Sequence, residues 1–62
     1  MCELSVYTVK GDAREKVMDG VVRLIIQDGR VLMEGIFGDS KEVEGKLAEV
    51  NIIAQNATII VT

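Results

Sequence analysis

Residues 21–36, VVRLIIQDGRVLMEGI, decide the fold of this chain. Two apolar runs, 21–27 and 30–36, flank the dipeptide Asp28-Gly29. Both central positions of such a two-residue hairpin turn need a positive φ, and Asp-Gly is one of the dipeptides that adopt it most readily. The stretch therefore predicts an antiparallel β-hairpin.

The turn also predicts the register of the hairpin, starting with Gln27 opposite Arg30. One face then carries three apolar cross-strand pairs: Ile26–Val31, Leu24–Met33 and Val22–Gly35. The other face places Arg23 opposite Glu34, and such an opposite-charge pair contributes roughly 0.2–1 kcal/mol. The uniformly apolar face is expected to face the core.

The segment before this hairpin contains one more expected strand. Residues 2–9 alternate, with Cys2, Leu4 and Val6 on one face, and Lys10-Gly11-Asp12 ends the pattern. Residues 13–18 are charged and contain no β-branched side chain before Val17. They are expected to form a loop or a short helical turn.

The segment after the hairpin predicts a second one. The run 42–55 contains Gly45 near its start, where a strand would bend or bulge at a barrel corner. A tight turn at Gln55-Asn56 would align three apolar pairs: Ala54–Ala57, Ile52–Ile59 and Val50–Val61. Gln55 is a poor choice for a positive φ, so this turn type is less well defined than the first.

Together these patterns predict an all-β fold, a small antiparallel barrel of about five strands of the SH3-like or Sm-like kind. A chain of 62 residues, with 48% hydrophobic and 3% aromatic content, is expected to form one domain over residues 1–62. Six aliphatic side chains fall on the nominally outer faces: Val21, Ile25, Leu32, Ile36, Ile53 and Ile60. Either the barrel's own loops cover them or a partner chain does, and a symmetric homodimer is the favoured explanation.

Charge and composition exclude several functional classes. A net charge of −3 and a pI of about 4.7 argue against a nucleic-acid backbone as the main partner. The chain has no histidine to activate Ser5 or Ser40, so no enzyme activity is predicted. One cysteine, no secretion signal and no bilayer-length apolar stretch indicate a cytoplasmic protein without a membrane anchor.

Cys2 is the only cysteine and the main candidate for chemistry. A lone cysteine that shares a strand face with Leu4 and Val6 is usually a small buried hydrophobe. Alternatively, a thiol next to a free amino terminus offers sulfur and nitrogen donors to a metal ion. The remaining candidates, Asp12, Glu15 and Asp19 for a hard cation, Met18 and Met33 for a soft metal, and the pair Glu42 and Glu44, are better explained by solvation or by core packing.

Several segments carry a family resemblance. The opening residues 1–7, the segment 14–22, the Asp28-Gly29 hairpin, the loop Ile36-Phe37-Gly38-Asp39 and residues 43–45 together resemble the CooT family. These are very small nickel-binding proteins associated with maturation of carbon monoxide dehydrogenase, and the wider family is also described as predicted RNA-binding proteins. The resemblance implies a small-barrel homodimer, a metallochaperone that binds one Ni(II) between the two chains through Cys2.

Two hypotheses therefore follow for function. In the first, two Cys2 thiolates and nitrogen donors from the chain termini hold Ni(II), an ion that suits a square-planar set of such ligands. Whether those nitrogens are the amine of Cys2 or donors that include Met1 stays open. In the second, the barrel is a non-catalytic module that binds RNA or protein through its few cations: Arg14, Lys16, Arg23 and Arg30.

Overall fold

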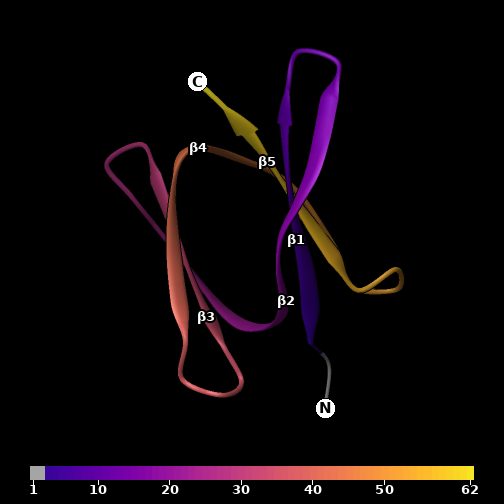
Figure 1. Cartoon of the computed structure of the whole chain (residues 1–62), viewed down its shortest axis with the longest axis vertical. Coiled ribbons are helices and arrows are strands. Elements are labelled where there is room, and N and C mark those ends of the chain that lie inside the picture. The colour runs from indigo at the N-terminus through magenta and orange to yellow at the C-terminus, as the bar shows by residue number, and fades with distance from the viewer. Residues whose placement is uncertain (1–2) are drawn as a thin grey trace.

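The computed structural model describes residues 3–62, which fold into a ring of five β-strands (Figure 1). The strands are β1 (Leu4–Lys10), β2 (Ala13–Gln27), β3 (Arg30–Gly35), β4 (Ser40–Asn51) and β5 (Asn56–Val61). Neighbours in the order β1-β2-β3-β4-β5 pair antiparallel, and a parallel pairing of β1 with β5 closes the barrel. The predicted small all-β barrel is confirmed, and closure through a parallel pair is an addition to it.

The hairpin of β2 and β3 forms as its sequence predicts. Asp28 and Gly29 both have positive φ, 51° and 74°. The register runs as expected from Gln27 opposite Arg30 to Arg23 opposite Glu34, and these last two side chains form an ion pair at 3.1 Å.

Beyond Arg23 the predicted register is wrong by one residue. A bulge lies between Val21 and Arg23, so that Val21 rather than Val22 pairs with Gly35. Val21 is fully buried and Val22 is 46% exposed, whereas the sequence pattern placed Val21 on the outer face. A single extra residue reverses which side chains point inward, because the side chains of a strand alternate.

The structure corrects a second expectation at residues 13–18, which form the first six residues of β2 and not a loop or a helical turn. They pair antiparallel with β1 through a tight turn at Gly11 and Asp12, with Lys10 opposite Ala13. Residues 13–16 are all exposed. Without an apolar side chain facing the core, these residues show no strand periodicity in the sequence.

The second hairpin also differs from its prediction. Its turn spans residues 52–55, and Asn51, not Ala54, begins the pairing with β5, opposite Asn56. The side-chain Oδ1 of Asn51 accepts a hydrogen bond from the N–H of Ala54 at 2.9 Å, which stabilises this longer turn. Ile52 and Ile53 therefore lie in the turn, exposed by 61% and 98%, and do not pair with β5.

Gly45 lies at the corner that its position in the sequence predicts. β4 pairs with β3 up to Glu44 and with β5 from Gly45 onward. A Cβ at Gly45 would lie 2.5 Å from the carbonyl oxygen of Ile60, so only glycine allows β5 to approach this closely.

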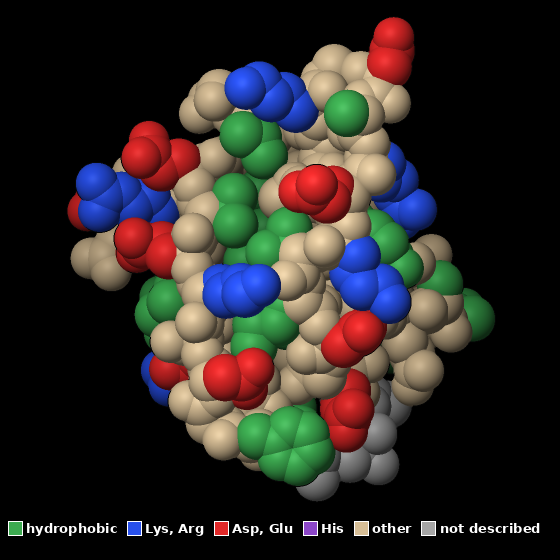
Figure 2. Space-filling model, viewed as in Figure 1, with side chains coloured by type: hydrophobic (Ala, Val, Ile, Leu, Met, Phe, Trp, Pro, Cys, Tyr) green, Lys and Arg blue, Asp and Glu red, His purple; other side chains and the backbone are tan. Residues whose placement is uncertain are grey.

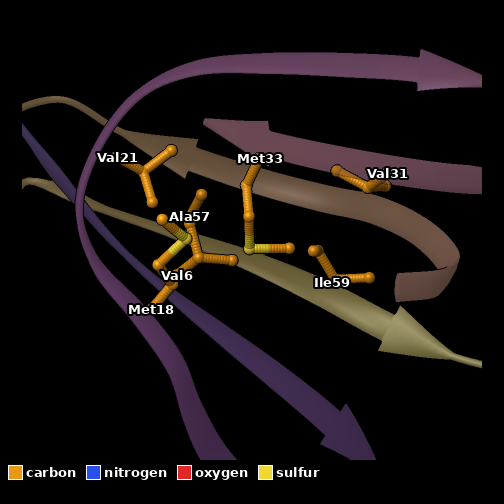
Figure 3. Close-up of a cluster of buried hydrophobic side chains, with 7 residues drawn as sticks. All are labelled: Val6, Met18, Val21, Val31, Met33, Ala57 and Ile59. Carbon is orange, nitrogen blue, oxygen red and sulfur yellow. The ribbon is translucent and has the colours of Figure 1, made fainter. Parts of the chain in front are cut away.

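The core is a single aliphatic cluster inside the ring. All five strands contribute to it or pack against it, and the close-up in Figure 3 shows the seven buried side chains converging. These residues are Val6, Met18, Val21, Val31, Met33, Ala57 and Ile59. Met18 and Met33 are thus core residues, as the sequence indicated.

Candidate functional site

The start of β1 is the part of the structure closest in sequence to the candidate ligand Cys2. Cys2 itself lies outside the described residues and is bonded to Glu3, the first residue described. Leu4 lies opposite Val21 of β2, and the N–H of Ser5 donates to the carbonyl of Gln55 at 3.0 Å. One end of the barrel, between β2 and β5, therefore holds the beginning of the described chain (Figure 1).

Glu3 lies next to the bend of β2 and the turn between β3 and β4. Gly20, with a φ of +64°, forms that bend, and its carbonyl accepts a hydrogen bond from the N–H of Ile36 at 2.9 Å. From the point where a Cβ on Gly20 would lie, Ile36 Cγ2 is 3.7 Å away and Glu3 Oε1 is 3.8 Å away. The carboxylate of Glu3 and the side chain of Ile36 therefore lie over the same glycine.

Metal donors are sparse in the part of the chain that the structure describes. Among residues 3–62 there is no group of three or more acidic or cysteine side chains that could hold a metal ion.

Asp19 is one of the three acidic residues that the sequence analysis considered as ligands for a hard cation, and its carboxylate is hydrogen-bonded to other side chains. Asp19 accepts hydrogen bonds from Ser5 Oγ at 2.6 Å and from Lys16 Nζ at 3.2 Å. The hydrogen bond from Ser5, followed by that from Lys16, lowers the pKa of the Asp19 carboxyl. Asp19 thus belongs to an exposed hydrogen-bonded cluster, in agreement with the interpretation of this segment as solvated.

Three of the four cations of the RNA hypothesis interact with acidic or aromatic side chains. Lys16 pairs with Asp19, Arg23 pairs with Glu34, and the guanidinium of Arg14 stacks 4.0 Å from the ring centre of Tyr7. Figure 2 shows Lys and Arg side chains separated by Asp and Glu across the face in view. This distribution gives little support to phosphate recognition, which needs clustered positive charge.

An open groove lies at the far end of the barrel from Glu3. It has a volume of about 700 Å³ and runs beside the Asp28-Gly29 turn, with Ile26, Leu47 and Thr62 among its lining residues. The side chain of Ile26 is 56% exposed there. The exposed residues Asp28, Glu44 and Lys46 also line the groove.

The exposure of two apolar turn residues was not predicted from the sequence: Ile52 was expected to pair with Ile59, and Phe37 was placed only in a loop. Phe37 is 93% exposed and Ile52 61% exposed. The neighbouring residues Gly38 and Asn51 were the available signal for a turn at these positions. An apolar residue in a turn has no strand partner to cover it. No helix in residues 3–62 is long and apolar enough to cross a membrane.

Fold and surface together define a small closed β-barrel in which residues 3–62 contain no group of three or more potential metal ligands. A family model described as CO dehydrogenase accessory protein CooT matches residues 1–61, and the chain belongs to this family. A crystal structure assigned to CooT from Carboxydothermus hydrogenoformans matches with a TM-score of 0.88 and 28% identity, over 98% of each chain. The comparison with curated proteins gives no significant match.

Proposed function

We propose that this protein is a homodimeric Ni(II)-binding accessory protein, with Cys2 of both chains as metal ligands. It supports nickel insertion into carbon monoxide dehydrogenase or a related metalloenzyme, as a cytoplasmic metallochaperone without catalytic activity of its own. The observation that carries the proposal is the match to the accessory-protein family over residues 1–61, a span that includes Cys2.

The positions of the described carboxylates support a ligand set made of thiolate and nitrogen donors. The described carboxylates nearest to the start of β1 are Glu3, beside Gly20, and Asp19, whose oxygens are hydrogen-bonded to Ser5 and Lys16. Neither is part of a cluster of three potential ligands within residues 3–62. A soft thiolate and amine or amide nitrogens are the donors that distinguish Ni(II) from the hard cations that prefer carboxylates.

A single thiol per chain explains why the proposed site needs two chains. One Cys2 supplies one sulfur, and a second copy related by a two-fold axis supplies the other without any further cysteine. Nitrogen donors from the two chain termini complete a four-coordinate set. The nickel is cargo for a client enzyme, so the donors must release the metal as well as bind it.

Titration of the purified protein with Ni(II) tests this proposal. We expect thiolate-to-nickel charge-transfer absorption that saturates at one metal per two chains, and its loss in Cys2→Ser. The matched control is Cys2→Ser combined with Thr62→Cys, which keeps one thiol per chain but moves it to the exposed end of the chain. We expect that variant not to restore binding at the same stoichiometry.

Unchanged nickel binding in Cys2→Ser would contradict the proposal. The same protein samples should be tested for RNA binding at two salt concentrations. A strong, salt-dependent RNA affinity, together with nickel binding that does not depend on Cys2, would support the alternative of an RNA-binding barrel.

A further inference from the structure

β1 and β5 lie at the centre of a four-stranded sheet, with the first part of β2 at one margin and the second part of β4 at the other (Figure 1). The inner side of this sheet carries Val6, Ala57 and Ile59, which are fully buried. The side chains that alternate with them point away from the core, because neighbouring residues of a strand face opposite sides. This outer surface, termed here the β1–β5 face, is arranged in rows across the four strands.

The first row of the β1–β5 face has an apolar centre between two cations. From β2 to β4 it consists of Arg14, Val9, Ile60 and Lys46. Ile60 is 50% exposed, Val9 is half-buried and both cations are exposed. Adjacent strands lie about 4.8 Å apart, so the backbones that carry the two cations are separated by about 14 Å. Lys46 also borders the groove beside the Asp28-Gly29 turn.

The next two rows carry opposite charges beside each other. The second row consists of Lys16, Tyr7, Thr58 and Glu49. Lys16 forms an ion pair at 3.2 Å with Asp19, whose carboxylate also accepts from Ser5. Within residues 3–62, by contrast, neither cation of the first row forms an ion pair. The guanidinium of Arg14 stacks 4.0 Å from the ring centre of Tyr7, which orders it before any ligand binds.

The charges of the β1–β5 face favour a short acidic ligand, although the chain itself has a net charge of −3. Complementary charge speeds encounter and excludes other partners. The aliphatic centre of the first row suits an apolar side chain, whereas nucleotide bases need an aromatic platform. Glu49 and Asp19 in and beside the second row would also repel a continuous phosphate backbone. The favoured occupant is therefore a protein segment with separated carboxylates.

The spacing of the first row suits an extended segment that lies across the strands. An extended chain rises about 3.4 Å per residue, so its residues i and i+4 are about 14 Å apart, which equals the separation of the two cation-bearing strands. Residues i, i+2 and i+4 of such a segment point to the same side. In a helix, residues i and i+4 are only about 6 Å apart.

We propose that the β1–β5 face binds an extended acidic segment of a protein partner. The segment carries carboxylates at positions i and i+4, which pair with Arg14 and Lys46, and an apolar side chain at i+2, which covers Val9 and Ile60. This inference goes beyond the proposed function, and nickel does not enter it.

NMR spectra of the ¹⁵N-labelled protein, titrated with the capped peptide TETLTET, test the proposal. The backbone amides of β1 and β5 near Val9 and Ile60 should shift, and high salt should weaken the binding. Two control peptides are TQTLTQT, which has no charge, and TEETLTT, which has the same composition with adjacent carboxylates. Both should bind at least threefold more weakly. Shifts confined to other strands, or equal binding of TETLTET and TEETLTT, would overturn the proposal.

Substitutions test the contribution of each part of the row. Arg14→Gln and Lys46→Gln should each weaken peptide binding about threefold, as expected for an exposed ion pair. Ile60→Thr should weaken it about fivefold through lost apolar burial. The matched controls are Arg30→Gln, on the outer face of the first hairpin, and Ile36→Thr, in the β3–β4 turn. Equal weakening in the variants and their controls would contradict a site at the first row.

Other occupants of the β1–β5 face give different results in the same spectra. Shifts of these amides when the protein alone is concentrated would assign the face to a second copy of the chain and overturn the proposal. Single-stranded RNA that shifts them at lower concentration than the peptide would also overturn it. Cys2→Ser should bind TETLTET as the wild type does, so the result is independent of the nickel experiment.

Discussion

A Cβ on Gly45 would lie 2.5 Å from the carbonyl oxygen of Ile60, at the point where β4 exchanges its partner β3 for β5. The backbones of β4 and β5 approach too closely here for any side chain. The N–H of Gly45 also donates to the carbonyl of Gly29 at 2.9 Å, which ties this corner to the turn of the first hairpin. Closure of the barrel thus depends on a glycine at this one position.

Gly45→Ala should destabilise the protein by about 3 kcal/mol, because the added methyl group meets backbone rather than a movable side chain. Gly11→Ala is the matched control, since a Cβ there would meet nothing within 4 Å and only its φ of +60° opposes the change. It should cost about 1 kcal/mol. Urea unfolding of both variants measures the difference, and equal losses would show that the corner is not a close contact.

Two substitutions in the turn between β4 and β5 should have opposite effects on the stability of the fold. Asn51→Ala removes the acceptor for the N–H of Ala54 and should cost about 1 kcal/mol. Gln55 has a φ of 57°, a conformation that is unfavourable for a residue with a side chain. Gln55→Gly should therefore stabilise the fold, by about 0.5 kcal/mol. Thermal unfolding distinguishes the two signs, and a destabilising Gln55→Gly would contradict this description of the turn.

The ion pair of Arg23 and Glu34 should contribute little to stability. Their side chains are 65% and 36% exposed and lie 3.1 Å apart on the outer face of the hairpin. A double-mutant cycle with Arg23→Ala and Glu34→Ala should give a coupling free energy of about 0.5 kcal/mol that decreases in high salt. A coupling several times larger and insensitive to salt would mean that the pair is shielded from water by another surface.

Asp19 should titrate below its ordinary pKa of 3.8 in the folded protein, because Ser5 and then Lys16 stabilise the carboxylate. The unfolded chain retains the ordinary value, so the stabilising effect of Asp19 is complete above it and is lost as pH falls through the lower folded value. Carboxyl NMR titration should show a rise in this pKa for Ser5→Ala. Thr8→Val, which removes no partner of Asp19, should leave it unchanged, and an equal shift in both variants would argue against the Ser5 hydrogen bond.

Nickel affinity should rise with pH over the range in which sulfur and nitrogen donors lose their protons. An ordinary thiol titrates near ~8.5 and an α-amine near ~8, and both must be deprotonated to bind a metal. Titrations at several pH values between about 6 and 9 measure this dependence, with the proton release obtained from buffers of different ionisation heat. An affinity independent of pH would exclude these donors.

The first hairpin could be predicted from sequence because its information is local. Asp28 and Gly29 determine the turn, and the turn determines the register as far as Arg23 and Glu34. The bulge that follows could not be predicted from the sequence, because Val21 and Val22 are adjacent and equally suited to the core. The exposed residues 13–16 give no alternation, so their strand depends on pairing with β1.

Longer-range features were less predictable. The four-residue turn after Asn51 depends on a side-chain hydrogen bond, whereas the apolar pattern alone favoured a shorter turn. The parallel pairing of β1 with β5 joins the two ends of the chain and has no local signature. For the site, Cys2 could be singled out by composition, and it stays a prediction because it lies outside residues 3–62. The exposure of Phe37 and Ile52 became evident only from the fold.

Native mass spectrometry of nickel-loaded protein tests the central claim most directly. The wild type should give the mass of two chains plus one nickel ion, and Cys2→Ser should give no such species under the same conditions. A wild-type species of one chain with one nickel ion, or an unchanged two-chain nickel complex in Cys2→Ser, would contradict a nickel site formed by Cys2 from both chains.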